Sequence, residues 1–169
     1  MEPVSIIELA EKDYDSAAKM VSGFRYELNK LKEIDKAQGH EDSLKELNEY
    51  IGKKYPVYIA KSNNDIYGYM VLKKEDTVVW VESIYIKSEY RKQGVAALLF
   101  QKAEQIAHGL GNETLFFWVH PNNEKMISFL AKQGYDTLNL IEIRKTKAQS
   151  EKGRIRVGEN EFRYGAGEK

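Results

Sequence analysis

The hydrophobic pattern changes its period twice between residues 77 and 119, and this constrains the fold more than any other feature. Residues 77–86 are rich in Val, Ile, Tyr and Trp, as strands are. From Gly94 apolar residues recur every three or four positions, which is the period of a helix, and they form one stripe: Val95, Leu98, Leu99, Ala103 and Ile106. Residues 114–119 are again a compact apolar strand. A strand, a helix and a strand in this order predict a βαβ-like unit with a partly parallel pair of strands.

Further elements are predicted on both sides of this unit. Upstream, the pattern indicates a strand, two helices and two antiparallel strands, at residues 4–9, 17–31, 43–51, 57–61 and 66–73. Downstream, it indicates a helix capped by Asn123, a strand and a final hairpin or edge strand, the last two at residues 135–144 and about 154–164. We therefore expect one mixed α/β domain over residues 1–169, with its core at about 4–144.

The composition excludes several classes of protein. Hydrophobic residues make up 42% and charged residues 31%, and the net charge is zero, so no overall field attracts nucleic acid or an anionic membrane. Without cysteine, neither a disulfide framework nor a thiolate metal site is possible, and three scattered histidines do not suggest a metal site. The N-terminus does not read as a signal peptide, and no apolar run approaches the roughly 18 residues of a membrane span. We expect a cytoplasmic protein.

Gly94 stands at the junction between a strand and a helix, directly after Arg91, Lys92 and Gln93. The first amides of a helix have no internal partner and its N-terminus is partly positive, so anions bind there. Gly94 has no Cβ and Ala96 is small, which lets a ligand approach the first turn. The pattern predicts a pyrophosphate site. The alternative is an ordinary helix start without a ligand.

Two stretches resemble the GNAT superfamily of acyl-CoA-dependent N-acetyltransferases. The run RKQGVA fits the R/Q-x-x-G-x-G/A motif of that family, and an apolar strand precedes it. The run VHPNNEKMISFLAKQGY, residues 119–135, is similar to the exit of the family's fifth strand and the helix that follows. Asn123, Gly134 and Tyr135 stand at the matching places. The predicted order of elements over about residues 4–144 also agrees with the GNAT fold.

The resemblance implies a mixed, mostly antiparallel sheet whose central fourth and fifth strands are parallel and splay apart, with helices on both faces. It also implies acetyl-CoA as the cosubstrate, without a metal. The pantetheine arm would pair with the end of the fourth strand, at Ile84, Tyr85 and Ile86. The pyrophosphate would bind backbone amides of the motif, at Arg91, Lys92, Gln93, Gly94, Val95 and Ala96. Asn123 matches a residue that contacts pantetheine or the adjacent backbone, and a plain helix N-cap is compatible with that role.

The activity implied by the resemblance is acetyl transfer from acetyl-CoA to a primary amine, by direct attack in a ternary complex. Such transfer needs a base, and Glu82 is the candidate, because several GNAT branches have a glutamate at this place. Alternation along the strand puts Glu82 on the same face as Trp80 and Ile84, where we expect it to lose part of its hydration. The alternative is a structural carboxylate that bonds a neighbouring group.

The sequence departs from the family at the residue that often protonates the leaving thiolate. Many GNAT enzymes have a tyrosine seven residues after the position of Asn123, and this chain has Leu130 there. Ser128, Tyr85 or a water could substitute. Some non-catalytic family members lack this tyrosine, so an acyl-CoA-binding or regulatory module without turnover is the second hypothesis.

The amine acceptor is not identified by the sequence. Several carboxylates in the second predicted helix and before it could attract a cationic amine, or could form a solvated face with the interleaved lysines: Asp35, Glu41, Asp42, Glu46 and Glu49. No nucleic-acid or membrane partner is expected. The final strands could form a homodimer by strand exchange or edge pairing.

Overall fold

The computed structural model describes residues 3–112, 114–145, 147 and 151–165. The chain packs as two compact units. The first comprises Met1–Glu27 and Lys36–Trp118, and the second comprises Leu28–Asp35 and Val119–Lys169. The first unit contains the sheet and the whole junction around Gly94. The second contains the end of the first long helix, a further helix and a hairpin.

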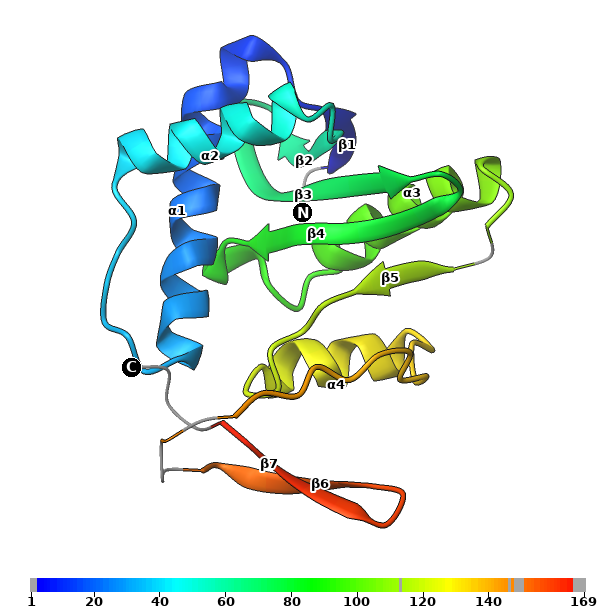
Figure 1. Ribbon diagram of the computed structural model, residues 1–169. Coiled ribbons are helices and arrows are strands. Elements are labelled where there is room, and N and C mark those ends of the chain that lie inside the picture. Colours follow the sequence, from blue (N-terminus) through cyan, green and yellow to red (C-terminus); the bar gives the residue numbers. More distant parts are fainter. Residues whose placement is uncertain (1–2, 113, 146, 148–150, 166–169) are drawn as a thin grey trace. The chain divides into compact units, whose positions relative to one another are not determined.

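A five-stranded sheet forms the centre of the first unit (Figure 1). Its strands follow the chain order: β1 (Ser5–Glu8), β2 (Val57–Ser62), β3 (Asp65–Glu75), β4 (Val78–Ile86) and β5 (Leu115–Phe117). The first three pairings are antiparallel and the last is parallel, with Val79–Val81 beside β5. This confirms the predicted mixed sheet and its parallel pair.

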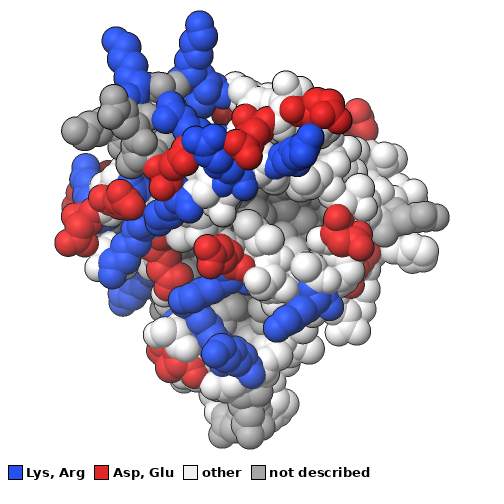
Figure 2. Space-filling model, turned by 90° about the horizontal axis from the view of Figure 1, so that it is seen from below, with Lys and Arg blue, Asp and Glu red and all other residues white. Residues whose placement is uncertain are grey.

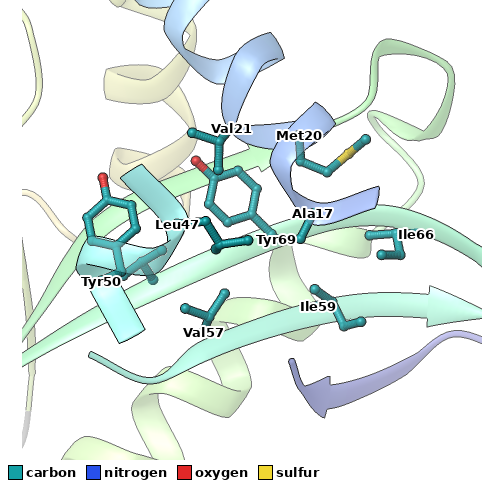
Figure 3. Close-up of a cluster of buried hydrophobic side chains, with 10 residues drawn as sticks. Ala17, Met20, Val21, Leu47, Tyr50, Val57, Ile59, Ile66 and Tyr69 are labelled. Carbon is teal, nitrogen blue, oxygen red and sulfur yellow. The ribbon is translucent and has the colours of Figure 1, made fainter. Parts of the chain in front are cut away.

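Two helices cover one face of this sheet, α1 (Tyr14–Leu31) and α2 (His40–Gly52) (Figure 1). Their apolar sides meet the sheet in one buried cluster, drawn in Figure 3: Ala17, Met20, Val21, Leu47, Tyr50, Val57, Ile59, Ile66, Tyr69 and Val71. On α2 the buried residues include Ser43 and Tyr50, whereas Leu44, which helical spacing places on one face with Leu47, is only half-buried. The polar ends of Ser43 and Tyr50 find hydrogen-bond partners, so burial of these residues is tolerated.

The opposite face is covered by α3 (Val95–Gly109), as Figure 1 shows. Phe100 of this helix stacks on Phe117 of β5, with the ring centroids 5.2 Å apart. The helix buries Val95, Leu99 and Ala103 as predicted. Leu98, which its spacing also places on this stripe, is 38% exposed, whereas Phe100 is buried.

In the second unit, α4 (Glu124–Lys132) begins after Asn123 as predicted, and a hairpin is formed by β6 (Gly153–Val157) and β7 (Asn160–Tyr164). The predicted strand at 135–144 is wrong: the structure has no strand there, and Leu138 and Leu140 are 74% and 72% exposed. Alternating apolar residues form a stable strand only where one face is covered, and the apolar side chains of this segment are exposed, including Ile141 and Ile143.

Charges of both signs are mixed on the surface of the chain. In Figure 2 acidic side chains lie among the basic ones over the face shown. In the hairpin, for example, Arg154 pairs with Glu151 and Glu161. Within the described ranges, none of the helices combines the length and apolar character that a bilayer crossing requires.

Candidate active site

Strand β4 contains one residue more than β3 opposite it. Val71 pairs with Ser83, but the next residue of β3, Leu72, pairs with Val81. Glu82 is therefore the extra residue of a β-bulge. A bulge interrupts the regular alternation of side chains, so the strand presents its side chains differently on the two sides of Glu82.

The bulge contradicts the expectation that Glu82 shares one face with both Trp80 and Ile84. Directly opposed residues of antiparallel strands point to the same face, and Trp80 pairs with Lys73 while Ile84 pairs with Met70. Lys73 and Met70 are three residues apart in β3, so they point to opposite faces. Trp80 and Ile84 are thus on opposite faces, and Glu82 is exposed rather than desolvated by both.

The end of β4 has an unpaired edge. Parallel pairing stops where β5 ends, at Val81 and Phe117, and no described strand pairs with β4 beyond this point on that side. The fourth and fifth strands therefore separate at the bulge. The edge left open comprises the last residues of β4, from Glu82 to Ile86.

The hydrogen-bond pattern tells which backbone groups of β4 face this open edge. The N–H of Lys87 donates to the carbonyl of Tyr67 in β3 at 2.9 Å. In an antiparallel pair, hydrogen-bonded and non-bonded positions alternate, so Tyr85 also directs its backbone groups to β3. Ile84 and Ile86 direct theirs to the open edge. Of the three residues predicted to pair with pantetheine, these two have the suitable orientation.

The N-terminus of α3 has the geometry of an anion site. Gly94 immediately precedes the helix with φ +85°, and no side chain caps the helix there. No atom lies within 4 Å of the place where a Cβ of residue 94 would be, so the space in front of the first turn is open. The first helical amides, beginning with Val95 and Ala96, are available to a ligand. Lys92 is exposed beside them, and its φ of +59° shows a tight loop.

The side chains of Arg91 and Gln93 bond to the chain rather than standing free beside these amides. Arg91 donates from Nε to the carbonyl of Ile86 at 2.8 Å and from its terminal nitrogen to Glu27 at 2.6 Å. Gln93 donates to the carbonyl of Glu89 at 2.7 Å. These bonds fix the loop to the end of β4, which holds the helix N-terminus in place.

Tyr85 packs its side chain against the α1 face of the sheet. Its hydroxyl lies 2.7 Å from where a Cβ of Gly23 would be, and the guanidinium carbon of Arg91 is 5.3 Å from its ring centroid. Burial, helped by the charge of Glu27, raises the pKa of the Tyr85 hydroxyl. The hydroxyl therefore stays protonated at neutral pH, and its raised pKa makes it a weaker acid than a free tyrosine.

The second unit contains the two remaining residues of interest. Asn123 is the N-cap of α4, and its side chain accepts a hydrogen bond from the N–H of Met126 at 3.2 Å. The capping role is therefore observed. Leu130 is buried on the same helix and offers no titratable group.

A hollow lies beside Glu82 and Val81. Three further residues line it, and the sequence did not identify them as functional residues: Lys73, Trp80 and Trp118. Trp118 is 73% exposed and lies against Trp80, with ring centroids 5.1 Å apart. Phe116 and Trp118 are two residues apart, and this spacing in a strand indicates aromatic side chains on one face. The sequence does not show that Trp80 lies beside them, because this follows only from the parallel register of β4 and β5.

A charged network links α1 and α2. Glu46 accepts hydrogen bonds from Arg25 at 2.6 Å, from the hydroxyl of Tyr50 at 2.6 Å and from Gln38 at 3.0 Å. Among the acidic residues of the insertion, Glu46 is thus not part of a solvated face. Its contacts are with the protein itself, and they tie the two helices together.

The comparisons with known proteins agree with this fold. The sequence profile of the Acetyltransferase (GNAT) family matches residues 24–135, which is more than half of the chain. Splayed parallel strands followed by an uncapped helix N-terminus, in a chain that matches this profile, define an acetyltransferase-type domain. The chain belongs to the Acetyltransferase (GNAT) family.

Solved structures of low sequence identity share the fold. A probable acetyltransferase has a TM-score of 0.67 at 19% identity, over 87% of this chain and 99% of that one. AAC(6')-Iy, solved in complex with the bisubstrate analogue CoA-S-monomethyl-acetylneamine, has a TM-score of 0.63 at 16% identity, over 86% of this chain and 99% of that one. The ribosomal-protein-S18-alanine N-acetyltransferase from Escherichia coli has a TM-score of 0.62 at 15% identity, over 78% of this chain and 77% of that one. No curated protein matches the chain.

Proposed function

We propose that this protein is an N-acetyltransferase that moves the acetyl group of acetyl-CoA to a primary amine within a ternary complex. One observation carries the proposal: an open edge of β4 leads directly to the uncapped N-terminus of α3, in a chain of this family. An extended arm that ends in a diphosphate is complementary to a strand edge followed by helix amides.

In this proposal, the pantetheine arm pairs like an added strand with the backbone of Ile84 and with the N–H of Ile86, because the Ile86 carbonyl already accepts a hydrogen bond from Arg91. The diphosphate accepts hydrogen bonds from the amides between Gly94 and Ala96, with Lys92 adding positive charge. Arg91 and Gln93 position the loop through their bonds to Ile86 and Glu89. Tyr85 contributes its side chain rather than its backbone.

Acetyl-CoA supplies an activated carbonyl carbon on a thiol leaving group. Glu82 first accepts one proton of the substrate ammonium, directly or through water, because it is exposed in the bulge where the two strands separate. The nitrogen of the neutral amine then forms a bond to this carbonyl carbon while the carbon–sulfur bond breaks. The second proton, which the nitrogen loses as it becomes an amide, balances the thiolate that leaves. Tyr85 or a water returns a proton to the thiolate.

A binding module without turnover is the second candidate. The buried Leu130 favours it, because this position has no hydroxyl to protonate the thiolate. The test is release of free CoA thiol from acetyl-CoA in the presence of a panel of primary amines. Amine-dependent release supports the enzyme. Binding of acetyl-CoA without release on any amine supports the module.

We further propose that residues 1–169 act as one domain and that the protein is a homodimer through β6 and β7. A two-stranded hairpin is marginally stable alone, and both of its edges can accept a further strand. Size-exclusion chromatography with light scattering tests the dimer. A mass of one chain at all concentrations contradicts it.

A further inference from the structure

The hollow beside Glu82 has an aromatic wall. Trp80 lies between Phe116 and Trp118, with ring centroids 5.2 and 5.1 Å away. Trp118 is 73% exposed, so most of its indole surface meets water. The exposed indole beside Trp80 offers a flat apolar surface, and a flat ring covers such a surface best.

The charges around the hollow favour a cation over an anion. Lys73 is paired with Glu75 at 2.7 Å, and that hydrogen bond is the main cause of its raised pKa, with Glu82 contributing. Glu82 has no ion-pair partner among the described residues. The three charges sum to one negative charge, located on Glu82. A ligand ammonium group is therefore attracted to the site, and a ligand carboxylate is repelled.

The face of Trp118 already accepts a cation. Nζ of Lys73 lies 5.9 Å from the centroid of that ring, within the range of a cation–π contact. The same lysine would repel the second charge of a long polycation that extended across the hollow. These observations favour a ligand with one positive charge.

We propose that the acceptor is a primary amine joined by a short linker to a planar aromatic ring. The ring lies against Trp118 and Trp80, and the ammonium lies beside Glu82. This inference rests on the proposed acetyltransferase function and names its substrate class. Trp118 is then a specificity-determining residue that acts on the acceptor and not on acetyl-CoA.

The test compares 2-phenylethylamine with ethylamine, which has the same amine and no ring, and with spermidine and a short peptide with a free N-terminus. We expect kcat/KM for 2-phenylethylamine to be about tenfold above that for ethylamine, the gain typical of one aromatic contact. Trp118→Ala should lower kcat/KM for 2-phenylethylamine more than for ethylamine and so remove this advantage, while the Kd of acetyl-CoA stays the same. Leu138→Ala, which truncates an equally exposed apolar residue, should change neither.

Binding is measured separately from turnover, through quenching of tryptophan fluorescence by 2-phenylethylamine. If acetyl-CoA does not bind, the proposed function fails. If acetyl-CoA binds and amines are acetylated without preference for the ring, only the substrate class is overturned. The same holds if spermidine or the peptide is preferred, or if Trp118→Ala affects both small amines equally. If 2-phenylethylamine neither quenches nor reacts, the aromatic acceptor is excluded.

Discussion

The hydroxyl of Tyr69 lies 2.5 Å from Oγ of Ser83, and both side chains are buried. Ser83 directly follows the bulged Glu82, so this hydrogen bond anchors β4 at the point where its alternation changes. Burial raises the pKa of the Tyr69 hydroxyl, which therefore stays protonated. The pair thus fixes the strand that presents the candidate base.

Ser83→Ala should destabilise the protein, because it leaves the Tyr69 hydroxyl buried without this partner. We expect a loss of about 1–3 kcal/mol in the free energy of unfolding, measured with urea. Adding Tyr69→Phe removes the orphaned hydroxyl and should recover much of the loss. A double variant as unstable as the sum of the two single variants would show that the hydrogen bond is not the cause.

Glu82→Gln should lower the turnover number about 10²–10⁴-fold if the carboxylate removes the proton of the amine. The amide has nearly the same shape, so the Kd of acetyl-CoA should not change. Steady-state release of CoA and calorimetric binding measure the two quantities. Glu8→Gln, an exposed carboxylate on β1, is the matched control and should behave as wild type. Equal turnover in the Glu82 variant removes this residue from the mechanism.

The network around Glu46 should make stability depend on pH. Burial raises the pKa of Glu46, but hydrogen bonds from Arg25, Tyr50 and Gln38 outweigh it and lower the pKa overall. The stabilisation is therefore present above the unfolded value of about 4.3 and is lost as the pH falls through the lower folded value.

Glu46→Gln should therefore cost about 1–3 kcal/mol of unfolding free energy at pH 7, less than for a fully buried pair because Arg25 is partly exposed. The difference from wild type should begin to shrink as the pH falls below about 4.3, where the carboxyl of the unfolded chain takes up a proton, and should go on shrinking as the pH falls through the lower folded pKa. Glu49→Gln on the exposed side of α2 should change stability by less than about 0.5 kcal/mol. A cost that is constant from pH 3 to 7 contradicts this assignment.

One domain should unfold in one step. Trp80 and Trp118 report on the first unit, whereas far-UV circular dichroism reports on helices and strands of both units. The two signals should give coincident urea transitions. A second, separate transition in circular dichroism would show that the units unfold independently.

The sequence predicted the helices and strands that have local signals. Its predictions failed where the structure depends on pairing between segments that are distant in the sequence. The change of period, the turn residues and Asn123 gave the sheet, α3 and α4. The strand predicted at 135–144 failed because alternation does not reveal whether an edge is available for pairing. The bulge at Glu82 was missed because it exists only in the register of β3 and β4, which also separates Trp80 from Ile84. The contact of Trp80 with Trp118 was missed because it depends on the parallel register of β4 and β5.

Calorimetric titration of acetyl-CoA into wild type, Gly94→Glu and Gly111→Glu tests the central claim most directly. Both glycines have positive φ, +85° and +80°, and open space around the missing Cβ, but they lie at opposite ends of α3. Both variants should therefore suffer similar backbone strain. The account predicts that wild type and Gly111→Glu bind acetyl-CoA alike, while Gly94→Glu loses binding because its carboxylate occupies the diphosphate site. Equal binding by all three, or no binding by wild type, would contradict it.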